Sequence, residues 1–121
     1  MNTGISFNSN RLIGIAYYFY PMVAKGGYVY IMSNQKRTVL YTGVTSNLYA
    51  RAYEHKNGIG SSFTSKYNCT DLMYFEFHEL IESAIEKEKS MKKWKRSFKE
   101  NLINSPNPGR IDLFDQVENF Q

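Results

Sequence analysis

Polar side chains occupy positions in this sequence that packing alone would give to apolar residues. Tyr30 and Tyr41 lie in two short apolar runs, where a plain β-strand would carry Val or Ile. Arg51 and His55 are four residues apart, so a helix would place both on one face. Glu88 falls in the middle of an apolar stripe at helical spacing, where an unpaired carboxylate would cost several kcal/mol. Together these are the side chains of phosphodiester chemistry, because arginine binds phosphate oxygens, a carboxylate binds a divalent cation, and phenol or imidazole transfers protons.

Each of these residues also has a purely structural interpretation. Glu88 can lie at the edge of the stripe and bond to an arginine, while Ile85 and Met91 carry the packing. Arg51 and His55 can belong to a solvated helix face. Two other catalytic patterns are missing from the sequence: there is no Ser-His-Asp arrangement, and the stretch 58–62 is too short for a phosphate-binding loop and lacks its lysine. The candidate chemistry therefore depends on whether the fold brings the five polar residues together.

The elements that must position these residues begin with a predicted β-hairpin. Two apolar runs flank a polar stretch, at residues 28–32, 39–44 and 33–38 respectively. Successive side chains of a strand point to opposite faces, so Tyr28 and Tyr30 share one face, and Tyr41 shares a face with Gly43. A register that brings Tyr30 near Tyr41 places both hydroxyls on the same side of the sheet. Gly43 then leaves room for a bulky group to approach the backbone.

The rest of the chain predicts further helices and a third strand. Ser46 or Asn47 caps the first helix and Gly58 ends it, while Ser83 and Glu86 form a capping box at the start of the second. The expected spans are helix 48–57, a loop with one helical turn at 58–68, strand 72–80, a long helix ending near residue 98, a short helical stretch at 100–104, and an amphipathic turn or two at 111–120. The order β-β-α-β-α predicts an α+β fold, in which helices flank a three-stranded antiparallel sheet.

Length and composition limit the class of protein. The 121 residues are enough for one domain with a modest core. A net charge of +4, with a pI near 9.1, favours polyanionic partners without requiring one. The single cysteine, Cys69, excludes an internal disulfide and zinc sites built from two or four cysteines. It also fits a reducing compartment, so the sequence predicts a cytoplasmic protein.

Residues 1–24 are interpreted as an N-terminal extension outside the functional domain. Their apolar stretch, Leu12–Ala24, is thirteen residues long and contains Pro21, whereas a membrane span needs about 20 residues. Its four aromatic residues and proline disfavour a secretory signal. Either translation begins at Met22 or the extension is loosely packed. The single functional domain is expected over residues 25–121.

Two tripeptides and their spacing to later residues form an ordered pattern. The tripeptides are Tyr28-Val29-Tyr30 and Tyr41-Thr42-Gly43. Eleven residues separate Tyr30 from Tyr41, ten separate Tyr41 from Arg51, and His55 and Glu88 follow. This set resembles the GIY-YIG nuclease superfamily, in particular its small stand-alone bacterial members, over residues 27–113. The stretch 84–96 is similar to their catalytic helix.

The sequence departs from the family pattern at a few positions. Tyr28 stands where the name of the family has glycine, and Val29 and Thr42 replace isoleucines. The last two face away from the tyrosines, so the departures affect packing more than chemistry. Gly109 and Arg110 follow an Asn-Pro pair where small members often carry an aromatic residue, which questions how the tail docks.

The resemblance implies an endonuclease that hydrolyses DNA phosphodiester bonds with one divalent cation, Mg²⁺ or Mn²⁺, in DNA repair or recombination. Glu88 would bind the metal, because one carboxylate suffices for an ion that keeps most of its waters. Tyr30 would assist deprotonation of the attacking water and Tyr41 would orient it or the phosphate. Arg51 would stabilise charge on the phosphate, and His55 would share proton transfer or grip the substrate. The family also carries a late asparagine near its site, for which the candidates are Asn101, Asn104 and Asn107.

DNA contact is expected from a basic segment. Seven Lys or Arg residues lie between Glu86 and Glu100, against three acids when these two are counted. They can bind backbone phosphates without sequence preference, or they can form a solvated helix face. The predicted substrate-binding residues are Gly43, Lys92, Lys93, Lys95 and Arg96. Trp94 can stack on an unpaired base, although core packing is favoured.

The predicted partner is DNA, with no membrane and no organic cofactor, and the oligomeric state is open. Two other functions remain. One is a non-catalytic nucleic-acid-binding module of the same fold. The other is a protein-interaction domain that uses the tail 111–120 or the N-terminal extension.

Overall fold

A computed structural model describes residues 26–117, and within this range the chain forms a three-stranded antiparallel sheet with helices on both faces. The strands are β1 (Gly27–Ser33), β2 (Leu40–Thr45) and β3 (Asp71–His78), in the order β2-β1-β3. The helices are α2 (Leu48–Lys56), α3 (Ser62–Lys66), α4 (Ile81–Lys92), α5 (Arg96–Asn104) and the short 3₁₀ helix η1 (Phe114–Gln116). The predicted α+β fold is confirmed, and α3 is the helical turn expected in the loop 58–68. Residues 1–25, which include the proposed extension, lie outside the described residues.

The register of the hairpin places both tyrosines on one face of the sheet. Tyr30 pairs with Gly43, and Tyr41 pairs with Met32. Tyr30 and Tyr41 are therefore diagonal neighbours, with ring centroids 6.5 Å apart. The arrangement predicted from strand alternation is present.

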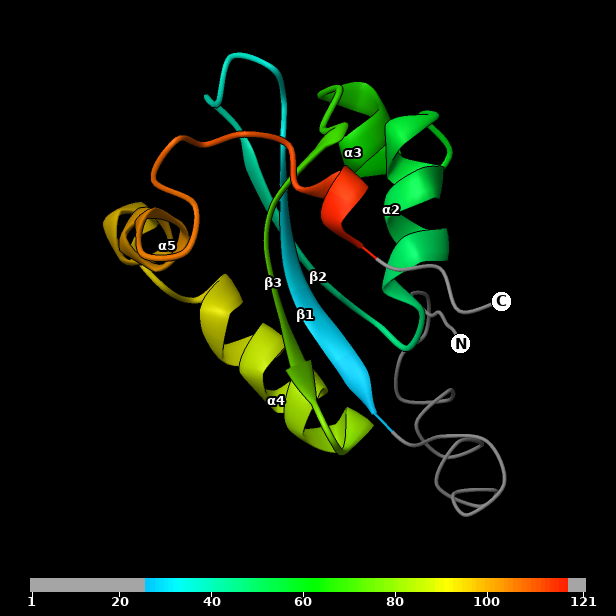
Figure 1. Ribbon diagram of the computed structural model, residues 1–121, viewed down its shortest axis with the longest axis vertical. Helices are drawn as coiled ribbons and strands as arrows, with labels where there is room; N and C mark the ends of the chain where they lie inside the picture. The colour runs from blue at the N-terminus through cyan, green and yellow to red at the C-terminus, as the bar shows by residue number, and fades with distance from the viewer. Residues whose placement is uncertain (1–25, 118–121) are drawn as a thin grey trace.

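The sheet separates two apolar layers. Val29 and Ile31 pack with the buried side chains of α4 and α5, such as Met91 and Ile103. Tyr30 and its neighbours pack on the opposite face with residues of α2, the 69–72 region and the tail. Figure 1 shows this division, with α4 and α5 on one side of the strands and α2, α3 and η1 on the other. The two tyrosines thus belong to the layer of α2 and α3.

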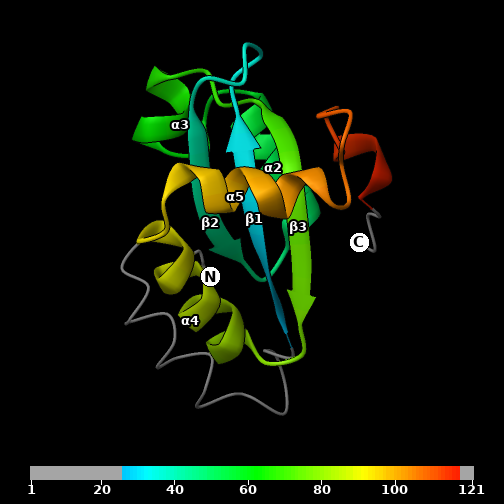
Figure 2. The ribbon, with the colours of Figure 1, turned by 90° about the vertical axis from the view of Figure 1, so that its left-hand side faces the viewer.

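The prediction of one long helix ending near residue 98 is wrong, because a turn at residues 93–95 separates α4 from α5. The amides of Lys93 and Trp94 bond to carbonyls only three residues back, which closes α4, and Lys95 is extended. α5 then crosses the face of the sheet, as Figure 2 shows, and Ile103 reaches the core. The apolar stripe continues straight in sequence, but Phe98 ends exposed because the turn redirects it.

The capping box that Ser83 and Glu86 were predicted to form at the start of α4 is also wrong. α4 begins at Ile81, two residues before Ser83, and its N-cap Leu80 forms no side-chain cap bond. The amides of Ser83 and Ala84 donate to the Leu80 carbonyl instead. The first helix fits its prediction more closely, because Asn47 caps α2 by accepting from the Ala50 amide at 3.0 Å.

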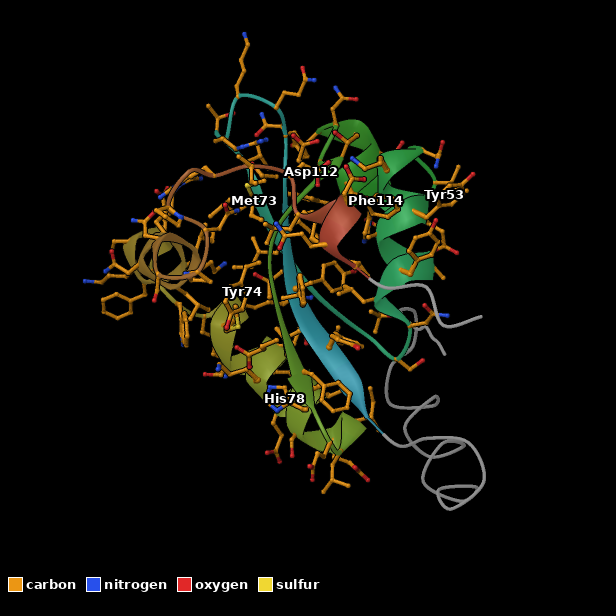
Figure 3. All side chains as sticks on the ribbon, viewed as in Figure 1. Tyr53, Met73, Tyr74, His78, Asp112 and Phe114 are labelled. Carbon is orange, nitrogen blue, oxygen red and sulfur yellow. The ribbon has the colours of Figure 1, made fainter. Side chains whose placement is uncertain are left out.

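The tail docks on β3 despite the missing aromatic residue. The Leu113 amide donates to the Leu72 carbonyl at 2.8 Å, and Asp112 accepts from the Leu72 amide at 2.9 Å. Farther along β3, Glu76 accepts from Tyr74 and from Lys87 of α4, and Figure 3 shows Tyr74 and its neighbour His78 on the side of β3 that faces α4. No helix within residues 26–117 is long and apolar enough to cross a membrane.

Candidate functional site

The centre of the site is the phenol of Tyr30. The residue is 1% exposed, and its hydroxyl lies 2.8 Å from Nε2 of His55 in α2. Its ring lies directly over Gly43 of β2, so a Cβ at that position would overlap the ring and the hydroxyl. The space that Gly43 was predicted to provide for an approaching group is therefore taken by Tyr30 itself.

His55 is fully buried and held at both ring nitrogens. Nδ1 lies 3.0 Å from the hydroxyl of Thr64 in α3, which in turn lies 2.9 Å from the hydroxyl of Ser61. Gly60 packs on the imidazole so closely that any Cβ there would overlap it. Burial, together with the positive charge of Arg51, lowers the pKa of His55 to about 3. The imidazole is therefore neutral at pH 7.

Three further charged or polar side chains face the Tyr30 hydroxyl. Burial raises the pKa of Tyr30, and the neighbouring Tyr41 and Glu88 raise it further, while Arg51 lowers it. Tyr41, from β2, lies 6.5 Å from Tyr30 between ring centroids, and the Lys92 ammonium that pairs with Glu88 of α4 at 2.6 Å lies 6.0 Å from the Tyr41 ring. Arg51 is also held by Glu54 one turn along its own helix, at 2.7 Å. The fold thus brings together the five residues that the sequence nominated as catalytic.

Glu88 is a buried residue of α4. Its side chain is 11% exposed and forms an ion pair with Lys92, one turn further along α4, at 2.6 Å. The Lys92 ammonium lies 6.0 Å from the ring centroid of Tyr41, and its side chain is 52% exposed. The structural interpretation of Glu88 expected an arginine partner, but the partner is this exposed lysine. Glu88 is therefore buried, and its carboxylate is paired with a side chain that reaches solvent.

The candidate metal ligand at this site is a single carboxylate, that of Glu88. Residues 26–117 contain no group of three or more His, Cys, Asp and Glu side chains gathered as a metal site. A Mg²⁺ ion keeps several waters and binds through one or two carboxylates, so Glu88 alone fits it. The ammonium of Lys92 at 2.6 Å marks this carboxylate as a place where positive charge is stabilised.

The four basic residues predicted to contact DNA lie around the turn between α4 and α5, but they are not equivalent. Lys93 and Lys95 are exposed at the turn. Arg96 donates to the backbone carbonyls of Arg37 and Thr38 at 2.9 and 2.8 Å, and to Glu100 at 2.6 Å. Arg96 therefore has a clear structural role, since it ties α5 to the hairpin loop.

The late asparagines divide in the same way. Asn107 is buried, and its side-chain amide donates to the Met73 carbonyl of β3 at 3.1 Å and to the Ile111 carbonyl at 2.9 Å. Asn104 is exposed and accepts from Arg110, and Asn101 is exposed as well. Asn107 thus fastens the segment after α5 to the sheet.

Thr64, Ser61 and Gly60 were missed by the sequence interpretation, which assigned them to a loop. The sequence does carry one signal, since Ser61 is a good N-cap residue and its hydroxyl accepts from the Thr64 amide at 3.1 Å. Their contact with His55 has no local signature, because it depends on how α3 packs against α2.

A model of the GIY-YIG catalytic domain matches residues 26–101. The chain belongs to this family. The matched segment contains β1 to α4 and the first part of α5, and with them the five candidate catalytic residues. No solved structure shows a significant match to the chain.

Relatives named UPF0213 proteins match about two thirds of the chain. One from Clostridium perfringens is 41% identical over 78 residues, which span 64% of this chain and 83% of that protein. One from Natronomonas pharaonis is 33% identical over 81 residues, 67% of this chain and 94% of that protein. One from Syntrophus aciditrophicus is 34% identical over 85 residues, 69% and 95% of the two chains. The names of these relatives state no activity.

Proposed function

We propose that this protein is a divalent-metal-dependent endonuclease that hydrolyses phosphodiester bonds of DNA. The observation that supports the proposal is the convergence of a guanidinium, a carboxylate, a second phenol and a neutral imidazole on the hydroxyl of Tyr30. Membership of the GIY-YIG family points to the same chemistry. A structural role alone does not require so many polar groups in one buried place, because each must be desolvated.

The groups differ in how they can meet a phosphate. Tyr30, His55 and Glu88 are buried, whereas Tyr41 and Arg51 retain partial exposure and Lys92 is open to solvent. DNA would therefore first contact the exposed members. Arg51 would stabilise negative charge on the phosphate oxygens, with Tyr41 orienting the phosphate or the attacking water.

Tyr30 and His55, which are buried, would transfer the proton that the attacking water loses. We assign the Nδ1–H tautomer to His55, because the Thr64 hydroxyl can donate to the Ser61 carbonyl at 3.3 Å and is then free to accept from Nδ1. Nε2 is then an acceptor for the Tyr30 hydroxyl. The proton of the Tyr30 hydroxyl can pass along this bond to Nε2, and the transient phenolate, which Arg51 favours, then takes a proton from water.

Glu88 would hold the divalent cation, with Lys92 moving to a DNA phosphate when the cation binds. A bound Mg²⁺ or Mn²⁺ would supply Lewis acidity to the phosphate and lower the pKa of a water nearby. Lys93 and Lys95 would add contacts to backbone phosphates, which give affinity without sequence preference. Such binding suits DNA repair or recombination in the cytoplasm.

The test is cleavage of supercoiled plasmid with Mg²⁺ or Mn²⁺ by the wild type, Glu88→Gln and Glu100→Gln. The two glutamates are matched, since each forms an ion pair at 2.6 Å with a cation four residues away, but Glu100 lies on α5 with Arg96 and Arg110. We expect Glu88→Gln to lose at least about 100-fold in rate, and Glu100→Gln to cut like the wild type. Equal melting temperatures of the two variants would show that the loss is chemical.

Other results of this experiment would contradict the role of Glu88 or favour one of the two alternative functions. Undiminished cutting by Glu88→Gln would contradict the role of this carboxylate. A salt-sensitive gel shift without cleavage would indicate a non-catalytic nucleic-acid-binding module. Neither cleavage nor a gel shift would leave the protein-interaction domain as the better interpretation.

A further inference from the structure

Aromatic rings continue from the site onto α3 and out to the surface. Tyr41 lies 5.7 Å from Phe63, centroid to centroid, with the two rings 29° from parallel. Phe63 lies 4.7 Å from Tyr67, which ends the helix. Tyr41 in turn neighbours Tyr30 at 6.5 Å. We call the three rings Tyr41, Phe63 and Tyr67 the α3 ladder.

The outer rings of the α3 ladder are not buried by the protein around them. Phe63 is 42% exposed and Tyr67 is 41% exposed, and Ile59 nearby in sequence is exposed as well. Single exposed apolar residues are common, but these two are in contact and adjoin the candidate catalytic centre. Their exposure is therefore a surface feature that a partner can use.

Helix α3 is anchored by residues other than the exposed rings. Thr64 is buried and bonds to His55, the Ser61 hydroxyl caps the helix, and the Cys69 amide closes it by donating to the Thr64 carbonyl at 2.9 Å. Phe63 and Tyr67 are four residues apart and so lie on one side of the helix. The rings can thus engage a ligand without loss of the bonds that hold the helix.

The charge around the α3 ladder selects an anionic ligand. Lys66 lies 5.3 Å from the ring centroid of Tyr67, and Lys92, whose ammonium is paired with Glu88 at 2.6 Å, lies 6.0 Å from that of Tyr41. The sequence from Lys56 to Thr70 contains no Asp or Glu. Aromatic rings interleaved with lysines match single-stranded nucleic acid, whose bases stack on rings while its phosphates meet cations.

We propose that the α3 ladder stacks an unpaired nucleobase beside the scissile phosphate, so that the preferred substrate is DNA with a single-stranded segment at the cut. The proposal deepens the proposed nuclease function and rests on it for the position of the cut. An intact duplex keeps its bases stacked on one another and cannot present one to Phe63 without disrupting a pair. Stacking tolerates any base, which agrees with binding that lacks sequence preference.

The test compares the wild type with the double variant Phe63→Leu/Tyr67→Leu, which keeps apolar bulk and removes the ring faces. The control is Phe98→Leu, because Phe98 is also exposed but lies on α5 across the sheet. Each protein is given one labelled sequence either as a fully paired duplex or as a duplex with a single-stranded arm. We expect the double variant to lose roughly 5- to 100-fold in kcat/KM on the armed substrate and little on the duplex. Phe98→Leu should change neither.

A binding experiment separates failure of this proposal from failure of the nuclease function. Single-stranded DNA containing 2-aminopurine is titrated without metal, and quenching of the base and the dissociation constant are measured. Stacking predicts strong quenching by the wild type and by Glu88→Gln, with both quenching and affinity lost in the double variant. Equal quenching and affinity in all proteins, or an equal loss of cleavage on both substrates, would overturn the stacking proposal even if the enzyme cuts DNA. Quenching that depends on the rings in a protein that cuts nothing would instead refute only the nuclease function.

Discussion

The burial of His55 predicts that the protein loses stability in mild acid. The imidazole has no exposed surface, bonds to Tyr30 and Thr64, and faces the positive charge of Arg51. Its pKa is lowered from 6.5 to about 3 in the folded state. As the pH falls, the unfolded chain therefore binds a proton at this histidine well before the folded chain does.

The size of the effect follows from the shift. Stability is complete above the unfolded pKa and declines as the pH falls from about 6.5 towards 3, by up to about 1.4 kcal/mol per pH unit. Between pH 7 and pH 5 the loss attributable to His55 is about 2 kcal/mol, a large part of a typical stability of about 5–15 kcal/mol. Unfolded carboxylates take up protons mainly below about pH 4.5, so this interval reports on histidine.

The assay is urea unfolding, followed by circular dichroism, at several pH values between 7 and 5. We expect a steep slope for the wild type and a nearly flat one for His55→Gln, whatever the variant's stability at pH 7. The control is His78→Gln, because His78 is partly exposed and bonds to Glu76 at 2.6 Å. This variant should keep most of the wild-type slope. A flat wild-type profile, or an unchanged slope in His55→Gln, would refute the account of a neutral, buried imidazole.

Four other substitutions test the surroundings of the site. The Thr42 hydroxyl is buried without a hydrogen-bond partner among residues 26–117, so Thr42→Val should raise the free energy of unfolding by about 1 kcal/mol, and a decrease would show that the hydroxyl is satisfied. Gly43→Ala should displace the ring of Tyr30 and slow cleavage by about 100-fold, and a normal rate would show that the ring position is not critical. Arg96→Ala should lower the free energy of unfolding by about 1 kcal/mol through its lost bonds to carbonyls, whereas Lys93→Ala should leave it unchanged and reduce the salt dependence of DNA binding by about one ion. The reverse pattern would exchange the structural and DNA-binding roles of these two residues.

The predictions that succeeded used patterns with a short range. Strand alternation placed Tyr30 and Tyr41 on one face, and Asn47 was a recognisable cap for α2. The helix boundaries around residue 93 failed for the opposite reason. The periodic stripe favoured one helix, but packing of Ile103 in the core and the bonds from Arg96 to the hairpin loop stabilise a turn there. These contacts join residues far apart in sequence, so no local pattern announces them.

The sequence by itself determined the chemistry that the site can offer. It set the identities and order of the two tyrosines, the arginine, the histidine and the glutamate, and it set the faces of the hairpin. Only the tertiary structure decided that they meet and in which state. His55 is neutral because α3 and the sheet bury it, and its partner Tyr30 is 25 residues away in sequence. Glu88 acts on the same phenol from α4, on the other side of the sheet. A side chain's type is local information, whereas its solvation and its neighbours' charges depend on the packing of the whole chain.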